Sequence, residues 1–287
     1  MTMKSSVLPR RGISLAALAA IYLGLISATV GISLSNLNYF EGRSEFVGLG
    51  NFFQLLGDQS FLVACYLTMK YSVVCTLLTF ACSCVWVLIV GHLVLRPIYL
   101  IAALAPWFMP PTTVGVIFQL LFDNQQGLIP ALLSTFTGAS KPDFLGNSVG
   151  AFWVAVVADV WQWAGIFGIA LALTAKSVPA ENIETVAVCG GGLGPQIVAV
   201  WIPFLLRPVS ALLIFKFFWN IADFDRLSAL TSGGGPLGTM RVFGLWIERT
   251  YFDFGDFGYG AAAAVAALTL AMLTVPLLLV LIAGRTQ

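Results

Sequence analysis

Two groups of polar side chains interrupt apolar stretches of the sequence, and their types suit the binding of a polar solute. In the first group, Asp159 and Gln162 are three residues apart, so a helix presents them on one face. Tryptophans and further polar residues complete the two groups: Trp161, Trp163, Lys216, Trp219, Asn220 and Asp223. Aromatic faces stack on the CH faces of a sugar ring, while amides and carboxylates bond its hydroxyls. Because polar groups inside apolar spans mark transport pathways by default, we expect these residues to line a path for a solute.

The same residues have alternative interpretations that the sequence leaves open. Tryptophans are enriched where a protein crosses the membrane–water interface, and they can serve there only as anchors. Lys70, in another apolar stretch, can extend its ammonium group to that interface. An ion pair between Asp159 and Lys216 is possible, but the spacing does not decide it.

Several kinds of chemistry are excluded or disfavoured. The single histidine, His92, rules out a site with several histidine ligands, and it argues against a membrane-embedded enzyme with paired acids and histidine. No phosphate-binding G-x-x-x-x-G-K-[ST] motif occurs, so the chain lacks this means of binding ATP. A net charge of +1 gives no reason to expect nucleic acid. The cysteines, most of them in one apolar stretch, are expected to act as small hydrophobic residues: Cys65, Cys75, Cys82, Cys84 and Cys189.

The composition indicates that lipid surrounds most of the chain. Of its 287 residues, 59% are hydrophobic and 9% are charged, against roughly 25% charged residues in soluble proteins. The mean hydropathy is +0.93. A soluble fold could not cover this much apolar surface with polar groups.

Six stretches are long and apolar enough to cross a bilayer, and each is expected to be a helix because backbone groups in lipid must be bonded internally. They run over about 13–34, 61–90, 98–122, 150–173, 202–222 and 258–283. The predicted fold class is therefore all-α, a polytopic membrane protein with one transmembrane domain over residues 1–287. No internal repeat is recognisable.

The distribution of lysine and arginine predicts that both termini are cytoplasmic. The side of the termini carries seven basic residues and the other side five, and the decisive cluster is Lys4, Arg10 and Arg11. An alternative is that the N-terminus is a cleaved signal peptide. We favour an uncleaved first span, because the apolar run of about 22 residues exceeds a typical signal core.

The long cytoplasmic loop, about 174–201, predicts a compact helix–glycine–helix element. Pro179 suits a helix start, and Glu181 and Glu184 fall in the first turns, where carboxylates favour the positive helix end. The helix should end at Gly190–Gly192, and a second short helix can begin at Pro195. A plain connection lying at the lipid interface is the alternative.

This loop resembles the "EAA" coupling loop of ABC importer permeases, whose pattern is E-A-A-x-x-x-G, nine variable residues, then I-x-L-P. Glu184 and Gly190 have the spacing of that pattern, and Val200-Trp201-Ile202-Pro203 stands where I-x-L-P is expected. The sequence departs from it in the two alanines and in an aspartate common in the sugar-transporter branch. The residues found instead are Thr185, Val186 and Cys189.

Other segments carry the same resemblance over about residues 13 to 283. They are Gly50-Asn51-Phe52, Pro106-Trp107, Leu121-Phe122-Asp123, and Phe224-Asp225 followed by Leu230 to Pro236. The chain is thereby similar to the carbohydrate-uptake branch, which contains maltose-, trehalose- and glycerol-3-phosphate-type permeases. The choice among sugars, sugar phosphates and glycosides stays open.

The resemblance implies the type I ABC importer permease fold and transport by alternating access in a bacterial inner membrane. The chain would form half of the pathway beside a second, homologous permease. Glu181, Glu184, Gly190 and Gly191 would contact a dimer of ATPase subunits, which bind the ATP and Mg, so this chain is a non-catalytic subunit without a cofactor of its own.

Gly233, Gly234, Gly235 and Pro236 would, by the same resemblance, face an extracytoplasmic solute-binding protein that delivers a carbohydrate. An ordinary tight turn is the other interpretation of this segment. The alternative function for the whole chain is an ion-coupled secondary transporter, a class that usually shows internal repeats.

Overall fold

The computed structural model describes the backbone of residues 7–90, 96–238 and 240–284, and the side chains of 18–89, 96–192, 194–236, 238 and 240–272. Four residues used in the predictions from sequence have side chains outside this described part: Lys4, Arg10, Arg11 and His92. The described chain is mostly helical. It divides into two compact units, one made of the residues up to Phe61 with Ile247–Met272, the other of Leu62–Trp246 with the residues after Met272.

The first unit is held together by polar side chains at the ends of its helices. It contains α1 (Val7–Ser33), the antiparallel strands β1 (Ser35–Asn38) and β2 (Arg43–Phe46), α2 (Gly50–Gly57), the last turns of α12 (Phe243–Phe252) and the first part of α13 (Phe257–Gly284). Asn51 is buried and donates to the carbonyls of Ser33 and Ser35, each at 2.9 Å. Tyr259 donates to Asp58 at 2.9 Å. Partial burial opposes ionisation of Asp58, but the hydrogen bonds that it accepts hold the pKa of this carboxyl below its ordinary value.

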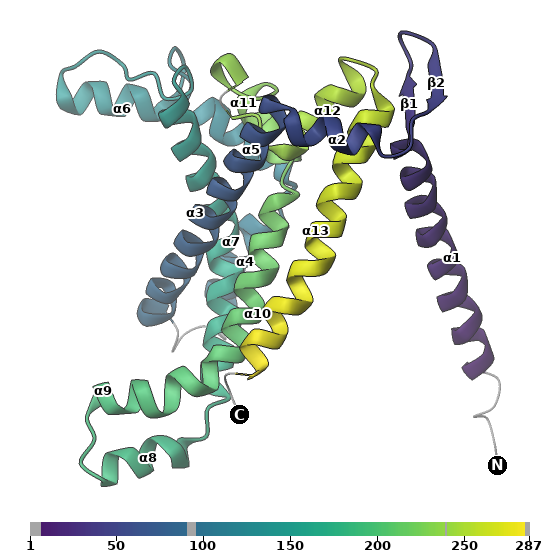
Figure 1. The fold of residues 1–287 in the computed structure, drawn as a ribbon. Helices are drawn as coiled ribbons and strands as arrows, with labels where there is room; N and C mark the ends of the chain where they lie inside the picture. Colours follow the sequence, from purple (N-terminus) through teal and green to yellow (C-terminus); the bar gives the residue numbers. More distant parts are fainter. Residues whose placement is uncertain (1–6, 91–95, 239, 285–287) are drawn as a thin grey trace. The chain divides into compact units, whose positions relative to one another are not determined.

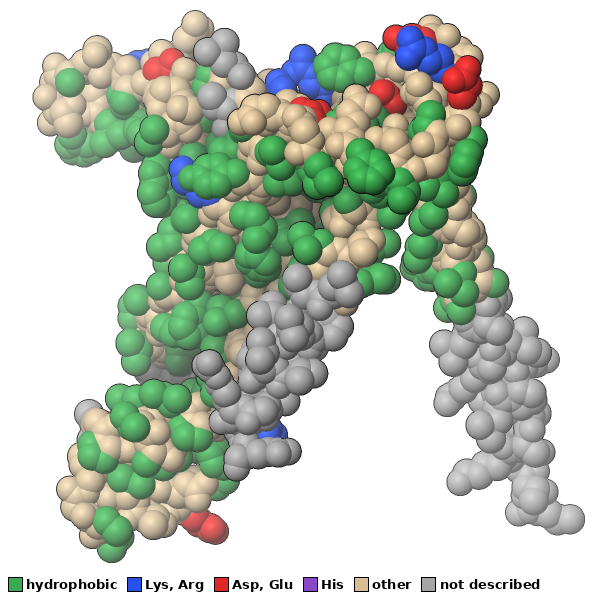
Figure 2. All heavy atoms as spheres, viewed as in Figure 1, with side chains coloured by type: hydrophobic (Ala, Val, Ile, Leu, Met, Phe, Trp, Pro, Cys, Tyr) green, Lys and Arg blue, Asp and Glu red, His purple; other side chains and the backbone are tan. Residues whose placement is uncertain are grey.

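The second unit contains the helices that carry the polar residues singled out in the sequence (Figure 1). They are α3 (Gln59–Val90), α4 (Pro97–Phe108), α5 (Pro111–Leu121), α6 (Leu128–Thr137), α7 (Ser148–Lys176), α8 (Ala180–Val188), α9 (Leu193–Gln196), a π-helical turn (Ile197–Trp201), α10 (Ile202–Ile221), α11 (Asp225–Thr231) and a 3-10 turn (Pro236–Gly238). Many hydrophobic side chains lie exposed along the flanks of these helices, as expected for a surface that faces lipid (Figure 2).

Three helices of the described chain are long and apolar enough to cross a membrane, and a broken pair makes a fourth candidate. The three are Gln59–Ile89, Ser148–Lys176 and Gly194–Ile221. Within the described side chains, Leu18–Ser33 and Phe257–Met272 form shorter apolar helices. Membrane-capable helices are thus confirmed, while the number of six spans stays a prediction.

The stretch 98–122 was predicted to be one continuous helix, and this is wrong, because α4 and α5 meet at a bend of 93°. Together the two helices stay one candidate span. Met109 and Pro110 between them have extended backbone, with ψ of 135° and 138°. Proline lacks the N–H needed to continue a helix and disfavours helical geometry in the residue before it. Two successive prolines, Pro110 and Pro111, therefore break the helix at this point.

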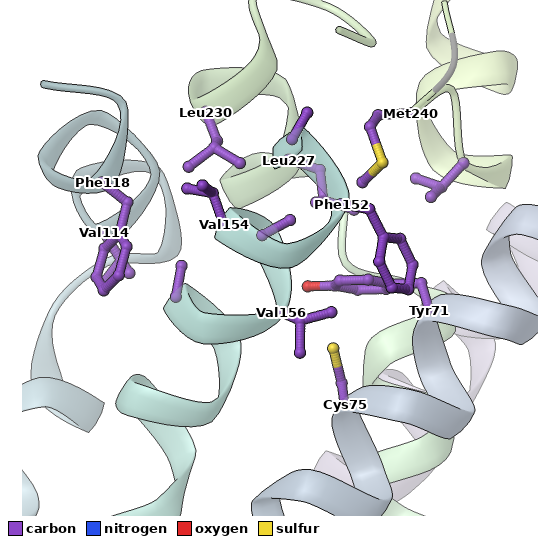
Figure 3. Close-up of a cluster of buried hydrophobic side chains, with 14 of the residues drawn as sticks. Tyr71, Cys75, Val114, Phe118, Phe152, Val154, Val156, Leu227, Leu230 and Met240 are labelled. Carbon is purple, nitrogen blue, oxygen red and sulfur yellow. The ribbon is translucent and has the colours of Figure 1, made fainter. Parts of the chain in front are cut away.

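A tightly packed apolar cluster joins α3, α5 and α7 to the short helix α11 (Figure 3). Tyr71 lies flat beneath Phe152, with ring centroids 6.5 Å apart, and its hydroxyl points from α3 toward α7. Leu227 and Leu230 bring the short α11 into the same cluster. Burial of these two side chains fixes a helix that would be too short to persist alone.

Close contact between α5 and α11 depends on Gly115. A methyl group there would lie 2.5 Å from the carbonyl oxygen of Arg226 and 2.9 Å from Cβ of Ala229. We expect Gly115→Ala to lower the free energy of unfolding by about 1–3 kcal/mol, because overpacked cores must shift their backbone. Thermal unfolding of the purified chain in detergent measures this. Gly24→Ala is the matched control, since that helical glycine has nothing within 4 Å, and equal melting temperatures for both variants would contradict the prediction.

Candidate functional site

The two polar groups of the sequence meet in the interior of the second unit. Asp159 on α7 and Lys216 on α10 are both fully buried, and Lys216 Nζ lies 2.8 Å from each carboxylate oxygen. Asn220, one turn further along α10, accepts from Lys216 at 2.5 Å. The ion pair that the sequence left undecided is therefore present.

Arg226 on α11 completes the site and was not among the residues singled out in the sequence. Its side chain is only 1% exposed. Its Nη2 lies 2.5 Å from Asp159 and also pairs with Asp223, and its Nη1 donates to Gln162 at 2.7 Å. The signal that could have found it is the three-residue spacing of Asp223 and Arg226 beside the apolar Leu227 and Leu230.

Hydrogen bonds connect these charges to two further elements. Tyr71 on α3 donates to Asp223 at 3.0 Å. Gln162 donates to the carbonyl of Met109 at 2.9 Å, at the break between α4 and α5. We call the connected set the buried charge network; its members are Asp159, Lys216, Asp223 and Arg226, with Tyr71, Gln162 and Asn220. Two cations and two carboxylates are thus held out of water, an arrangement that persists only when each charge is paired and bonded.

A cavity of about 150 Å³ opens in front of this network. Its lining combines three tryptophans with polar members of the network: Trp107, Met109, Pro111, Gln162, Trp163, Trp219, Asp223 and Arg226. The rings of Trp163 and Trp219 lie 5.2 Å apart, and those of Trp107 and Trp163 6.5 Å apart. The cavity therefore offers aromatic surface beside hydrogen-bonding groups.

The structure separates the predicted pathway residues into three sets. Gln162, Trp163, Trp219 and Asp223 line the cavity. Asp159, Lys216 and Asn220 belong to the network but are absent from that lining. Trp161 is away from both, since it packs on Phe118 with ring centroids 5.7 Å apart and is 41% exposed.

The predicted helix–glycine–helix element is present between α7 and α10. Helix α8 follows Pro179, and its side chains, Glu181 and Glu184 included, are not buried. Gly190 has a φ of +77°, which favours glycine, and its amide donates to Ala187 while that of Gly191 donates to Val186. In Figure 1, α8 and α9 project beyond the ends of α7 and α10.

The glycine-rich turn follows α11, at the opposite end of the unit from α8 (Figure 1). The backbone of Ser232, Gly233, Gly234 and Gly235 has positive φ at all four positions, between 49° and 128°. Thr231 stabilises the turn, accepting from the amide of Gly234 through its hydroxyl and from that of Gly235 through its carbonyl. Gly233 is exposed while Gly234 is buried, so part of the turn is accessible.

Comparison with known proteins identifies relatives over most of the chain. No protein-family model matches it. The trehalose/maltose transport system permease protein MalF of Thermococcus litoralis is 28% identical over 253 residues, 86% of this chain and 83% of that protein. The diacetylchitobiose uptake system permease protein DasB of Streptomyces coelicolor is 26% identical, over 84% and 75% of the two chains. The sn-glycerol-3-phosphate transport system permease protein UgpA of Yersinia pestis is 29% identical, over 92% and 88%.

The fold has solved counterparts as well. A chain of a bacterial alginate ABC transporter, crystallised with an alginate pentasaccharide-bound periplasmic protein, superposes with a TM-score of 0.74 at 16% identity over 100% of this chain and 99% of its own. In both sequence and fold the chain is similar to permease subunits of ABC importers. Within that class its relatives are carbohydrate-uptake permeases, which confirms the resemblance that the motifs predicted and disfavours a secondary transporter.

Proposed function

We propose that this chain forms half of the translocation pathway of an ATP-driven, binding-protein-dependent importer for a sugar or sugar derivative. The observation that carries the proposal is the tryptophan-walled cavity in front of the buried charge network. Aromatic walls and polar groups at one place are what a sugar ring requires. The chain acts by alternating access beside a second, homologous permease.

In this proposal the whole chain is one transmembrane domain that crosses the bacterial inner membrane six times, with both termini in the cytoplasm. Helices α1 and α13, with 27 and 28 residues, supplement the four candidates already described. At 1.5 Å per residue each reaches about 40 Å, which exceeds the hydrocarbon thickness of a bilayer.

The cytoplasmic partner is a dimer of ATPase subunits, which binds ATP and Mg, while this chain holds no cofactor and catalyses no reaction. Helix α8, with Glu181 and Glu184 exposed, docks on the ATPase. It is joined directly to α7 and, through α9, to α10. These are the helices that carry Asp159 and Lys216, so movement of α8 reaches the buried charge network through two rigid elements.

On the extracytoplasmic side, the turn from Gly233 to Pro236 contacts a solute-binding protein. The turn follows α11 directly, and α11 carries Arg226 of the buried charge network. Docking of the binding protein therefore acts on the same network as the ATPase, from the opposite end.

Copurification tests the proposal. We expect the chain, expressed with a candidate ATPase subunit and a second permease, to purify as a complex that drives ATP-dependent sugar uptake in proteoliposomes. Glu184→Lys should reduce this uptake at least about tenfold, a loss of about 1.4 kcal/mol of coupling. Glu45→Lys, an exposed reversal in β2, is the control and should leave uptake unchanged. Failure to copurify, together with normal uptake by Glu184→Lys, would overturn the proposal.

A further inference from the structure

We infer that the cavity accepts an electrically neutral sugar and rejects anionic derivatives such as sugar phosphates and uronates. This inference rests on the proposed function and narrows its substrate class. It follows from the paired charges around the cavity, from the Asp223 carboxylate on its wall and from the tryptophans that line it.

Among the described residues, the cavity lining has no cation that is free to bind an anion. Its charged lining residues within the described chain are Asp223 and Arg226. Arg226 already pairs with Asp223 and with Asp159, and Lys216 behind it pairs with Asp159. The charges of the two cations and the two carboxylates therefore cancel, and the network has no net charge. A phosphate or carboxylate placed in the cavity would therefore bring an uncompensated charge into a water-poor interior, where its desolvation is not repaid.

The hydrogen-bonding groups of the cavity suit a hydroxyl group. Asp223 supplies a carboxylate to the cavity wall. A sugar hydroxyl can donate to this carboxylate. A phosphate dianion offers only acceptors and would meet the Asp223 carboxylate with like charge.

The aromatic walls of the cavity also favour a neutral sugar over an anion. Three tryptophans line the cavity, and the faces of aromatic rings carry partial negative charge. The CH faces of a neutral sugar stack favourably on such a surface, whereas an anion does not. Lys216 Nζ lies 4.8 Å from the ring centroid of Trp163, and its charge is neutralised by Asp159.

Matched ligand pairs test the inference on the importer complex without its binding protein. The full-length chain is assembled with its partner permease and ATPase in lipid nanodiscs and titrated with glucose or glucose 6-phosphate, and with trehalose or trehalose 6-phosphate. We expect a change in tryptophan fluorescence with the neutral member of at least one pair, and binding at least about tenfold weaker for its phosphate. Trp219→Phe should remove much of the change. The inference is overturned if the phosphate binds as tightly as the neutral sugar or more tightly, or if neither member of either pair binds. It is also overturned if Trp219→Phe leaves the fluorescence change undiminished.

A charge change in the network gives a second, independent measurement. Asp223→Asn leaves the network with one net positive charge, so it should raise the affinity for trehalose 6-phosphate at least about tenfold over the unmodified chain. Asp225→Asn, an exposed carboxylate two residues further on, is the matched control and should produce no such gain. Equal affinity of both variants for the phosphate overturns the inference. If Asp223→Asn does not fold, the comparison of each sugar with its phosphate on the unmodified complex still decides the inference.

Two outcomes separate this inference from the proposed function. A complex that assembles and imports a sugar phosphate leaves the proposed function standing and overturns the inference that the substrate is neutral. Failure to assemble with the ATPase counts against the proposed function.

Discussion

Asp159→Ala is expected to lower the free energy of unfolding by about 3–5 kcal/mol, the usual cost of leaving a buried charge without its partner. Asp159 accepts from Lys216 through both carboxylate oxygens and from Arg226 through one of them. All three side chains are at most 1% exposed. After the substitution, two buried cations share the single remaining carboxylate of Asp223. Thermal unfolding of the purified chain in detergent, followed by intrinsic fluorescence, measures the change.

A double variant separates the loss of a charge pair from the loss of packing. Asp159→Asn with Lys216→Met removes one charge of each sign and leaves Arg226 paired with Asp223, so it should be more stable than Asp159→Asn alone by at least about 1 kcal/mol. Asp225→Ala, which removes an exposed carboxylate, should stay within about 0.5 kcal/mol of the unmodified chain. Equal stability of the single and double variants would show that Asp159 and Lys216 do not interact as the structure indicates.

The position of this network bears on how the second unit can move. Helices α7 and α10 are joined at one end through α8 and α9, and again in their interiors by Asp159 and Lys216. Arg226 ties α11 to the same carboxylate, and Gln162 ties α7 to the break after α4. Elements linked at two separate points tend to move together, because sliding one past the other would expose an unpaired buried charge. Under the proposed function, stability and transport should therefore both depend on Asp159.

Local features of the site were predictable from sequence, whereas its assembly was not. The shared face of Asp159 and Gln162 follows from their spacing within one helix. The approach of Lys216, which is 57 residues further along the chain, depends on how α7 and α10 pack. Arg226 was missed because α11 has only seven residues, too few for a helical hydrophobic period to be recognised, and because its burial comes entirely from tertiary contacts.

For the membrane spans, too, the ends of the helices were predictable from the sequence, whereas a break within one of them was not. The ends of α3, α7 and α10 fall within three residues of the predicted bounds, because a bilayer sets the length of an apolar helix directly. The break in 98–122 was not predicted, although Pro110 and Pro111 were visible, because prolines are tolerated in membrane helices when neighbours satisfy the freed backbone groups. Gln162 does this by donating to the carbonyl of Met109. That hydrogen bond links the bend to the buried charge network and could be found only in three dimensions.

The second large effect is expected at the glycines that end α8. A side chain at Gly191 would lie 2.6 Å from Cγ1 of Val186 and 2.8 Å from its carbonyl oxygen, the acceptor that closes the helix end. Gly191→Val should therefore open this turn and displace α8 relative to α9. Because α8 has no buried side chains, moving it relieves the clash at little cost to the stability of the complex. If α8 must keep one orientation on the ATPase, this displacement should reduce ATP-driven uptake at least about tenfold.

The neighbouring glycine provides the control for this prediction. Gly192 is exposed and has nothing within 4 Å, so Gly192→Val adds the same side chain one residue later without a clash. Uptake and ATPase activity of both variants are measured in the same proteoliposomes, together with the melting temperature of each complex. Because no side chain of α8 is buried, Gly191→Val should change the melting temperature little while it uncouples hydrolysis from uptake. Equal uptake by the two variants would mean that the orientation of α8 does not control transport, whatever the importer carries.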